Sequence, residues 1–163
     1  MSNTWKALGG IGLALLFAGQ MHSQGLVTER SLSLAMAKTI AEETLAQCQA
    51  KGYHTSAVVV DRAGQVLVML RDEKATAQNA EMARRKAYTA RMFRRSTMEF
   101  QKRTADPGYI AQRDLTDILA LGGGMPINVG DETIGGVGSA GSTQETDDAC
   151  AKAGVAKVAD MLK

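Results

Sequence analysis

Clustered glycines place the strongest constraint on how this chain can fold, since eight of its 17 glycines lie between Gly122 and Gly141. Glycine has no Cβ, so it allows positive φ angles and the close approach of another backbone. Gly136, Gly138 and Gly141 match the dinucleotide-binding pattern Gly-x-Gly-x-x-Gly, after an expected strand and before an expected helix. No further parallel strand is expected after that helix, and Asp160, 22 positions after Gly138, falls inside it. We therefore favour tight packing of a strand and a sharp strand-to-helix turn. A flat ligand lying against these glycines is the intermediate alternative.

The first 23 residues are typical of a secretory signal peptide. Lys6 supplies a positive charge, and an apolar run follows over residues 7–18. This run is too short to span a bilayer, which needs about 20 apolar residues. We predict cleavage after Ser23 and a periplasmic or secreted protein without a stable membrane anchor. The alternative is an N-terminal core helix, which the glycines at positions 9, 10 and 12 disfavour.

The remaining residues, 24–163, are expected to form a single domain. Their apolar periodicity predicts helices over 32–51, 76–103 and 143–162, and a short helix followed by an extended segment within 110–121. Hairpins are expected from strands 56–61 and 66–71 and from strands 125–129 and 132–137. This order predicts an α+β fold: a five-stranded antiparallel sheet flanked by helices, with the N- and C-terminal helices packed on it.

The two cysteines are too few for a four-cysteine zinc module. Cys48 lies on the apolar stripe of the first helix, and Cys150 lies on that of the last. If both helices cover the same face of the sheet, the thiols can meet, and export would permit a disulfide. Closing a loop of about 100 residues could contribute up to about 4.7 kcal/mol in the chain-entropy model. We favour the disulfide, and two buried free thiols remain the alternative.

His54 is the one histidine left after removal of the leader, which contains His22. A lone histidine cannot build a three-histidine zinc site. It could supply one axial ligand to a haem iron. Taken by itself, the residue is more often an ordinary surface histidine in a loop.

The segment 76–103 is strongly basic, with eight Lys and Arg residues against two glutamates. It is either a solvated helix face or a site for carboxylate or phosphate groups. Nucleic acid is not an expected partner, because the chain carries a net charge of only +2 and no aromatic residues alternate with these basic ones as a stacking platform.

Several motifs in this order resemble a known family. They are the segment 58–61 with Gly64, Arg71-Asp72, and the segments 86–90, 123–127, 135–141 and 148–151. The chain resembles the HbpS-like haem-binding family, which includes GlcG-like proteins and the C-terminal domain of PduO-type cobalamin adenosyltransferases, over residues 32–160. The resemblance implies a five-stranded antiparallel sheet, assembly into homo-oligomers, and binding of haem or a related tetrapyrrole.

The leading hypothesis is an exported haem-binding protein with a role in haem or iron handling and no catalytic activity. His54 would ligate the metal, three basic side chains would pair with propionates, and the glycine segment would lie against the ligand. The candidate residues are His54, Arg71, Lys86, Arg91, Gly122, Gly123 and Gly124. One alternative is a small enzyme that acts on an anionic metabolite through Asp61, Arg71 and Lys86. Another is an oligomeric scaffold or sensor partner without a small ligand.

Overall fold

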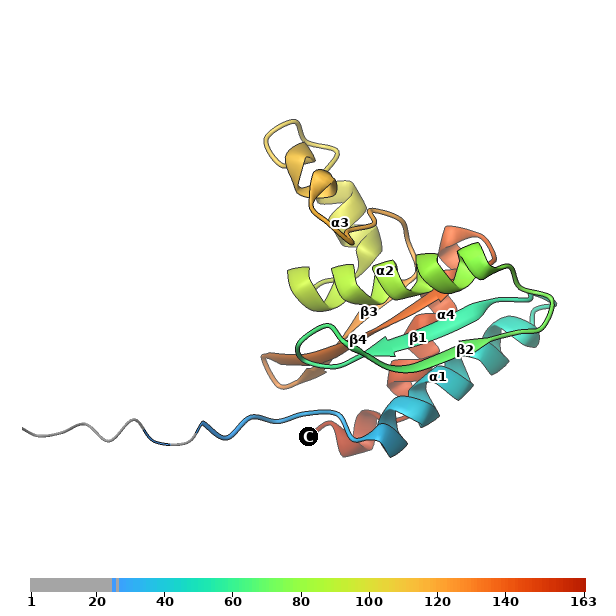
Figure 1. Ribbon diagram of the computed structural model, residues 1–163, viewed down its shortest axis with the longest axis horizontal. Coiled ribbons are helices and arrows are strands. Elements are labelled where there is room, and N and C mark those ends of the chain that lie inside the picture. Colours follow the sequence, from blue (N-terminus) through green and yellow to red (C-terminus); the bar gives the residue numbers. More distant parts are fainter. Residues whose placement is uncertain (1–24, 26) are drawn as a thin grey trace, which may run out of the picture.

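The computed structural model describes residue 25 and residues 27–163, so the expected signal peptide lies outside the described residues. The described chain folds into one antiparallel sheet between helices (Figure 1). Its strands are β1 (Ser56–Val60), β2 (Val66–Arg71), β3 (Gly124–Val129) and β4 (Glu132–Ala140), in the spatial order β2-β1-β4-β3. Both hairpins expected from the sequence are present, and β4 pairs with β1 to join them.

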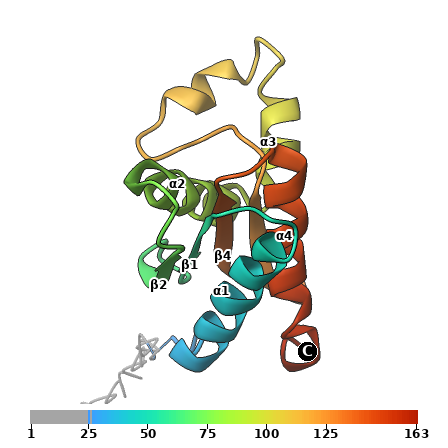
Figure 2. The same cartoon turned by 90° about the vertical axis from the view of Figure 1, so that its right-hand side faces the viewer.

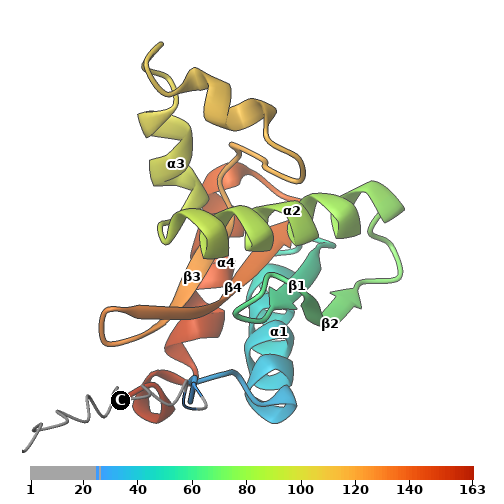
Figure 3. The same cartoon turned by 60° about the vertical axis from the view of Figure 1, so that its left-hand side comes forward.

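Helices cover both faces of the sheet. α2 (Ala77–Phe93) packs on one face, while α1 (Leu34–Gln49) and α4 (Gln144–Ala156) lie side by side on the other (Figure 2). α3 (Thr97–Arg103) and the 3-10 helix η1 (Ile110–Asp114) project beyond the sheet (Figure 3), and a second short 3-10 helix, η2 (Ala159–Met161), follows α4. The α+β class is therefore confirmed. In the part of the chain that the structure describes, no helix is both long and apolar enough to cross a membrane.

The prediction of a fifth strand is wrong, because the described residues form a sheet of four strands. The segment after η1 bonds to side chains of α2 instead of to a strand. The Leu119 N–H donates to Thr89 Oγ1 at 2.9 Å, and the Ile118 carbonyl accepts from Arg85 Nη2 at 2.6 Å. Because these backbone groups already have hydrogen-bond partners, the segment does not pair with a strand of the sheet.

The single long helix expected over 76–103 is also divided. Arg94 takes a left-handed conformation with φ of 53° and ends α2. Ser96 then starts α3 with a capping box, in which its side chain accepts from the Glu99 N–H and the Glu99 side chain accepts from the Ser96 N–H. The chain changes direction at this point, and α3 is thereby placed outside the sheet layer.

The glycines of β4 allow α2 to approach the sheet closely. A Cβ added at Gly136 would lie 2.4 Å from the Ala87 carbonyl oxygen, and one added at Gly138 would lie 2.1 Å from that of Ala83. Real Cβ atoms do not approach so closely, so only glycine fits beneath the small-residue stripe of α2, which consists of Ala83, Ala87 and Ala90. Backbone packing therefore explains the glycine pattern, as we favoured over a dinucleotide site.

The core has two parts, separated by the sheet. Alternate residues of β1 point to opposite faces, so Val59 packs toward α1 and α4, while Val58 and Val60 pack toward α2. All three are fully buried, which accounts for the uninterrupted run of valines.

Candidate functional site

His54, one of the predicted ligand groups, lies exposed in the loop between α1 and β1. Its side chain is 45% exposed, and its Nδ1 lies 3.0 Å from Asp72 Oδ1. Asp72 directly follows β2 and donates its backbone N–H to the Thr55 carbonyl at 3.0 Å, so the β1–β2 hairpin brings the two side chains together.

The Asp72 carboxylate is fixed from three sides. Gln49 Nε2 donates to Oδ2 at 2.9 Å, and the Lys74 N–H donates to Oδ1 at 2.9 Å. The bonds from Gln49, Lys74 and His54, in that order of size, lower the pKa of Asp72 to about 2. The group is therefore ionised at neutral pH, and its Oδ1 lies beside Nδ1 of His54. With Nδ1 beside this carboxylate, Nε2 is the ring nitrogen left for another partner, the arrangement found in carboxylate–histidine–metal sites.

Arg71 and exposed apolar groups lie at the same end of the sheet. Arg71 is the last residue of β2, and its Nη1 donates to the Ala75 carbonyl. Met69 occupies the same face of β2, two positions earlier, and is 44% exposed; Tyr53, next to His54, is 36% exposed. A histidine, a cation and exposed apolar side chains thus lie at the same end of the sheet.

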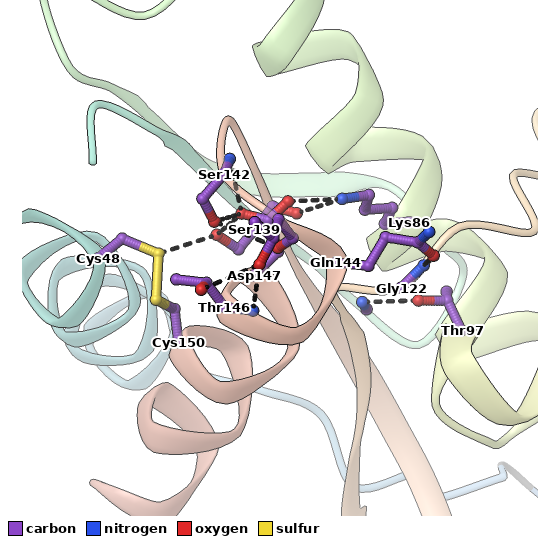
Figure 4. Close-up of polar contacts among 12 residues, drawn as sticks. Cys48, Lys86, Thr97, Gly122, Ser139, Ser142, Gln144, Thr146, Asp147 and Cys150 are labelled. Atoms are coloured by element: carbon purple, nitrogen blue, oxygen red, sulfur yellow. Dashed lines mark hydrogen bonds and ion pairs between the residues drawn. A yellow bond between two sulfur atoms is a disulfide. The ribbon is translucent and has the colours of Figure 1, made fainter. Parts of the chain in front are cut away.

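Lys86, by contrast, is committed to a buried network (Figure 4). Its Nζ donates to Asp147 Oδ2 at 2.8 Å and to the Ser139 carbonyl at 2.9 Å. The two charged side chains are 1% and 2% exposed. Ser142 Oγ donates to the other carboxylate oxygen at 2.7 Å. Burial lowers the pKa of Lys86, and the Asp147 carboxylate partly offsets that shift.

The segment Gly122–Gly124 packs against this network. A Cβ added at Gly123 would lie 2.9 Å from Lys86 Nζ, and one added at Gly124 would lie 2.4 Å from the Lys86 carbonyl oxygen. The backbone N–H of Gly122 donates to Gln144 Oε1 at 2.9 Å, and that of Gly124 donates to Thr97 Oγ1 at 2.8 Å (Figure 4). Protein atoms therefore fill the space in front of the glycines on the α2 side.

The expected disulfide is present. Cys48 of α1 and Cys150 of α4 are joined, with their Cα atoms 5.7 Å apart. Cys48 Sγ lies 3.5 Å from Ser139 Oγ, so the bridge borders the Lys86 network (Figure 4).

Arg91 lies far from His54. Added Cβ atoms show that Gly136 faces Arg91, whereas Gly141 faces the His54 carbonyl. These glycines are five positions apart along an extended segment, which corresponds to roughly 16 Å. The structure thus places His54 and Arg71 at the same end of the sheet, buries Lys86 with the glycine segment, and leaves Arg91 at the opposite end.

Sequence reasoning missed the acidic partner of each base. Asp147 was not singled out from the sequence, and Asp72 was noted only within a motif. A usable signal was present for one of them. Lys86 directly precedes Ala87 in the small-residue stripe of α2, and a lysine buried there requires a carboxylate. For Asp72, the sequence carries no comparable signal of its contact with Gln49.

No group of three or more His, Cys, Asp or Glu side chains able to hold a metal ion occurs within the described residues.

The fold and the ordered glycine motifs define a class of small α+β domains. Comparison with known proteins identifies the family within this class. The chain belongs to the family described as haem degrading protein HbpS-like, which matches residues 32–156. It is 31% identical, over 120 residues, to an uncharacterized 15.0 kDa protein in the dhaT-dhaS intergenic region of Citrobacter freundii, covering 72% of this chain and 84% of that protein.

Two solved structures share the fold. The crystal structure of HbpS has 35% sequence identity and a TM-score of 0.77, with 80% of this chain and 92% of that chain covered. The PduOC:Heme complex has 24% identity and a TM-score of 0.70, with 77% and 94% covered. Its likeness shows the fold alone.

Proposed function

We propose that this protein is an exported haem-binding protein with a role in haem or iron handling, in which His54 is an axial ligand of the haem iron. The observation that carries the proposal is the His54–Asp72 pair, where a fixed carboxylate holds Nδ1 of a half-exposed imidazole at 3.0 Å. Membership of the HbpS-like family supports haem as the ligand. PduOC, which shares the fold, was crystallised with heme.

The residues around His54 fit such a ligand. Arg71 supplies a cation for a propionate, and Met69 and Tyr53 supply apolar surface for the porphyrin. Lys86 takes no part, because its ammonium already bonds to Asp147 and Ser139. Arg91 lies at the other end of the sheet and cannot serve the same haem in one protomer.

The enzyme alternative has no support from the geometry. Asp61 Oδ1 accepts from the Ala63 and Gln65 N–H groups of its own turn, at 2.8 and 2.9 Å. Lys86 is buried in its network, and Arg71 lies at the other end of β2 from this turn. The three residues therefore form no common site.

The haem proposal is tested by titrating the purified protein with haemin and following the Soret band. We expect a saturable shift that is lost, or weakened at least about tenfold, in His54→Ala. Tyr53→Phe is the matched control, since it keeps the aromatic ring, removes only the neighbouring phenol hydroxyl, and should leave the shift unchanged. No saturable shift in the unaltered protein would overturn haem binding. An unchanged shift in His54→Ala would overturn only the ligand assignment.

Export and assembly are tested separately. The signal-peptide pattern and the Cys48–Cys150 disulfide support export. Mass spectrometry of protein from its source should give a chain that begins at Gln24, in the periplasm or the medium. A full-length chain found only in the cytoplasm contradicts this. Native mass spectrometry of the same sample should show the homo-oligomer that we propose from the family resemblance.

A further inference from the structure

An arginine-lined groove lies at the end of the sheet opposite His54. Arg30, Arg62, Arg91 and Arg94 line it, and residues 129–133, at the turn between β3 and β4, complete its wall. Its volume is about 760 Å³, within the range of roughly 300–1,000 Å³ typical of small-molecule sites.

The acidic residues of the groove do not neutralise these arginines equally. Two carboxylates pair with Arg62: its Nη1 donates to Glu132, and its Nε lies 3.3 Å from a Glu29 carboxylate oxygen. Among the described residues, neither Arg91 nor Arg94 forms an ion pair. Two guanidinium groups that form no ion pair therefore share one groove.

Arg91 also carries an unused donor. Its Nε is buried and has no hydrogen-bond partner within the described chain. A buried donor left unsatisfied costs about 1–3 kcal/mol, so such groups normally have a partner. Burial lowers the pKa of Arg91, and the neighbouring charges of Arg62 and Arg94 lower it further. A bound anion would relieve the repulsion between these guanidinium groups.

We propose that this groove binds a small organic anion through a carboxylate or phosphate group held by Arg91 and Arg94. The guanidinium fork matches the oxygen spacing of both groups. The Asp131 carboxylate, in the turn between β3 and β4, can accept a hydrogen bond from a hydroxyl group of the same ligand. The site is independent of the proposed haem site, from which it is separated by roughly 16 Å along the sheet.

Isothermal titration with inorganic phosphate and with citrate tests the proposal and distinguishes the two oxyanions. We expect saturable binding of at least one, weakened about tenfold or more in Arg91→Gln and in Arg94→Asn. Asparagine tolerates the left-handed conformation at position 94, so the second variant keeps the fold if the first does not. Lys51→Gln removes the same charge from an exposed position just after α1 and should bind normally.

Three results would overturn the proposal: no binding of either anion, equal binding by the arginine variants, or equal weakening in Lys51→Gln, which indicates nonspecific charge attraction. Haemin titration of the folded arginine variant tests whether the groove is separate from the proposed haem site. An unchanged Soret shift is expected. A parallel loss of haem and anion binding would show that the groove belongs to the haem site.

Discussion

Two carboxylates of this protein each hold a base, but with opposite exposure. In the Asp147–Lys86 pair both side chains are at most 2% exposed, and the ammonium bonds only to protein oxygens. In the Asp72–His54 pair the carboxylate is 3% exposed but the imidazole is 45% exposed. The first pair can only hold α2, β4 and α4 together, whereas the second leaves its imidazole half-exposed at the surface. The exposure of the base, rather than the strength of the pair, separates a structural contact from a candidate site.

The largest effect is expected from breaking the buried pair. Lys86→Met leaves Asp147 charged and uncompensated in the interior, and such a change typically costs about 3–5 kcal/mol. Urea unfolding followed by circular dichroism measures the loss. The double variant Lys86→Met/Asp147→Leu should recover much of it, because no buried charge then remains. Lys102→Met, on α3, is the control and should change stability by no more than about 0.5 kcal/mol. A loss below about 1 kcal/mol in Lys86→Met contradicts the structural role.

The disulfide beside that pair should contribute the next largest effect. It joins residues 102 positions apart, and bridges of this kind typically contribute about 2–4 kcal/mol. Unfolding with and without reductant should therefore differ by this amount. In the Cys48→Ser/Cys150→Ser variant the reductant should have no effect. Equal stability of the oxidised and reduced protein would show that the neighbouring contacts alone hold α1 against α4.

Local patterns predicted much of this fold, because they depend on residues close in sequence. The valine run of β1, the turn before β2, and Gly52 with its φ of 82° after α1 all carry such signals. The break at Arg94 carries none, since arginine seldom adopts a left-handed conformation. The missing fifth strand was likewise decided by α2 side chains that bond to residues 118–119.

The candidate site was harder to predict, because its contacts are long-range. Lys86 and Asp147 are 61 positions apart, and only the packing of α2 and α4 at one end of β4 joins them. His54 meets Asp72 only through the register of β1 and β2. The sequence therefore suggested candidate residues one by one, but it grouped Lys86 and Arg91 with a histidine that neither accompanies.

A smaller effect is expected at the exposed pair, in binding rather than in stability. Asp72→Asn keeps the shape but removes the charge that orients His54, and loss of such a partner typically weakens metal binding 10–100-fold. Haemin titration should show this weakening while the protein stays folded. Asp114→Asn, on the exposed η1, is the charge-matched control. Equal haem affinity in Asp72→Asn would mean that the carboxylate does not support the ligand.

The smallest effect is the acid dependence of the same carboxyl group. Its pKa falls from 3.8 to about 2 in the folded protein, so the unfolded chain binds the proton more tightly. Asp72 therefore stabilises the fold at pH values above 3.8, and this contribution disappears as the pH falls to about 2. The free energy of unfolding should differ between the unaltered protein and Asp72→Asn at neutral pH, and the difference should shrink in acid. A difference that stays constant between pH 6 and about 2 would show that packing of the side chain, and not its charge, is responsible.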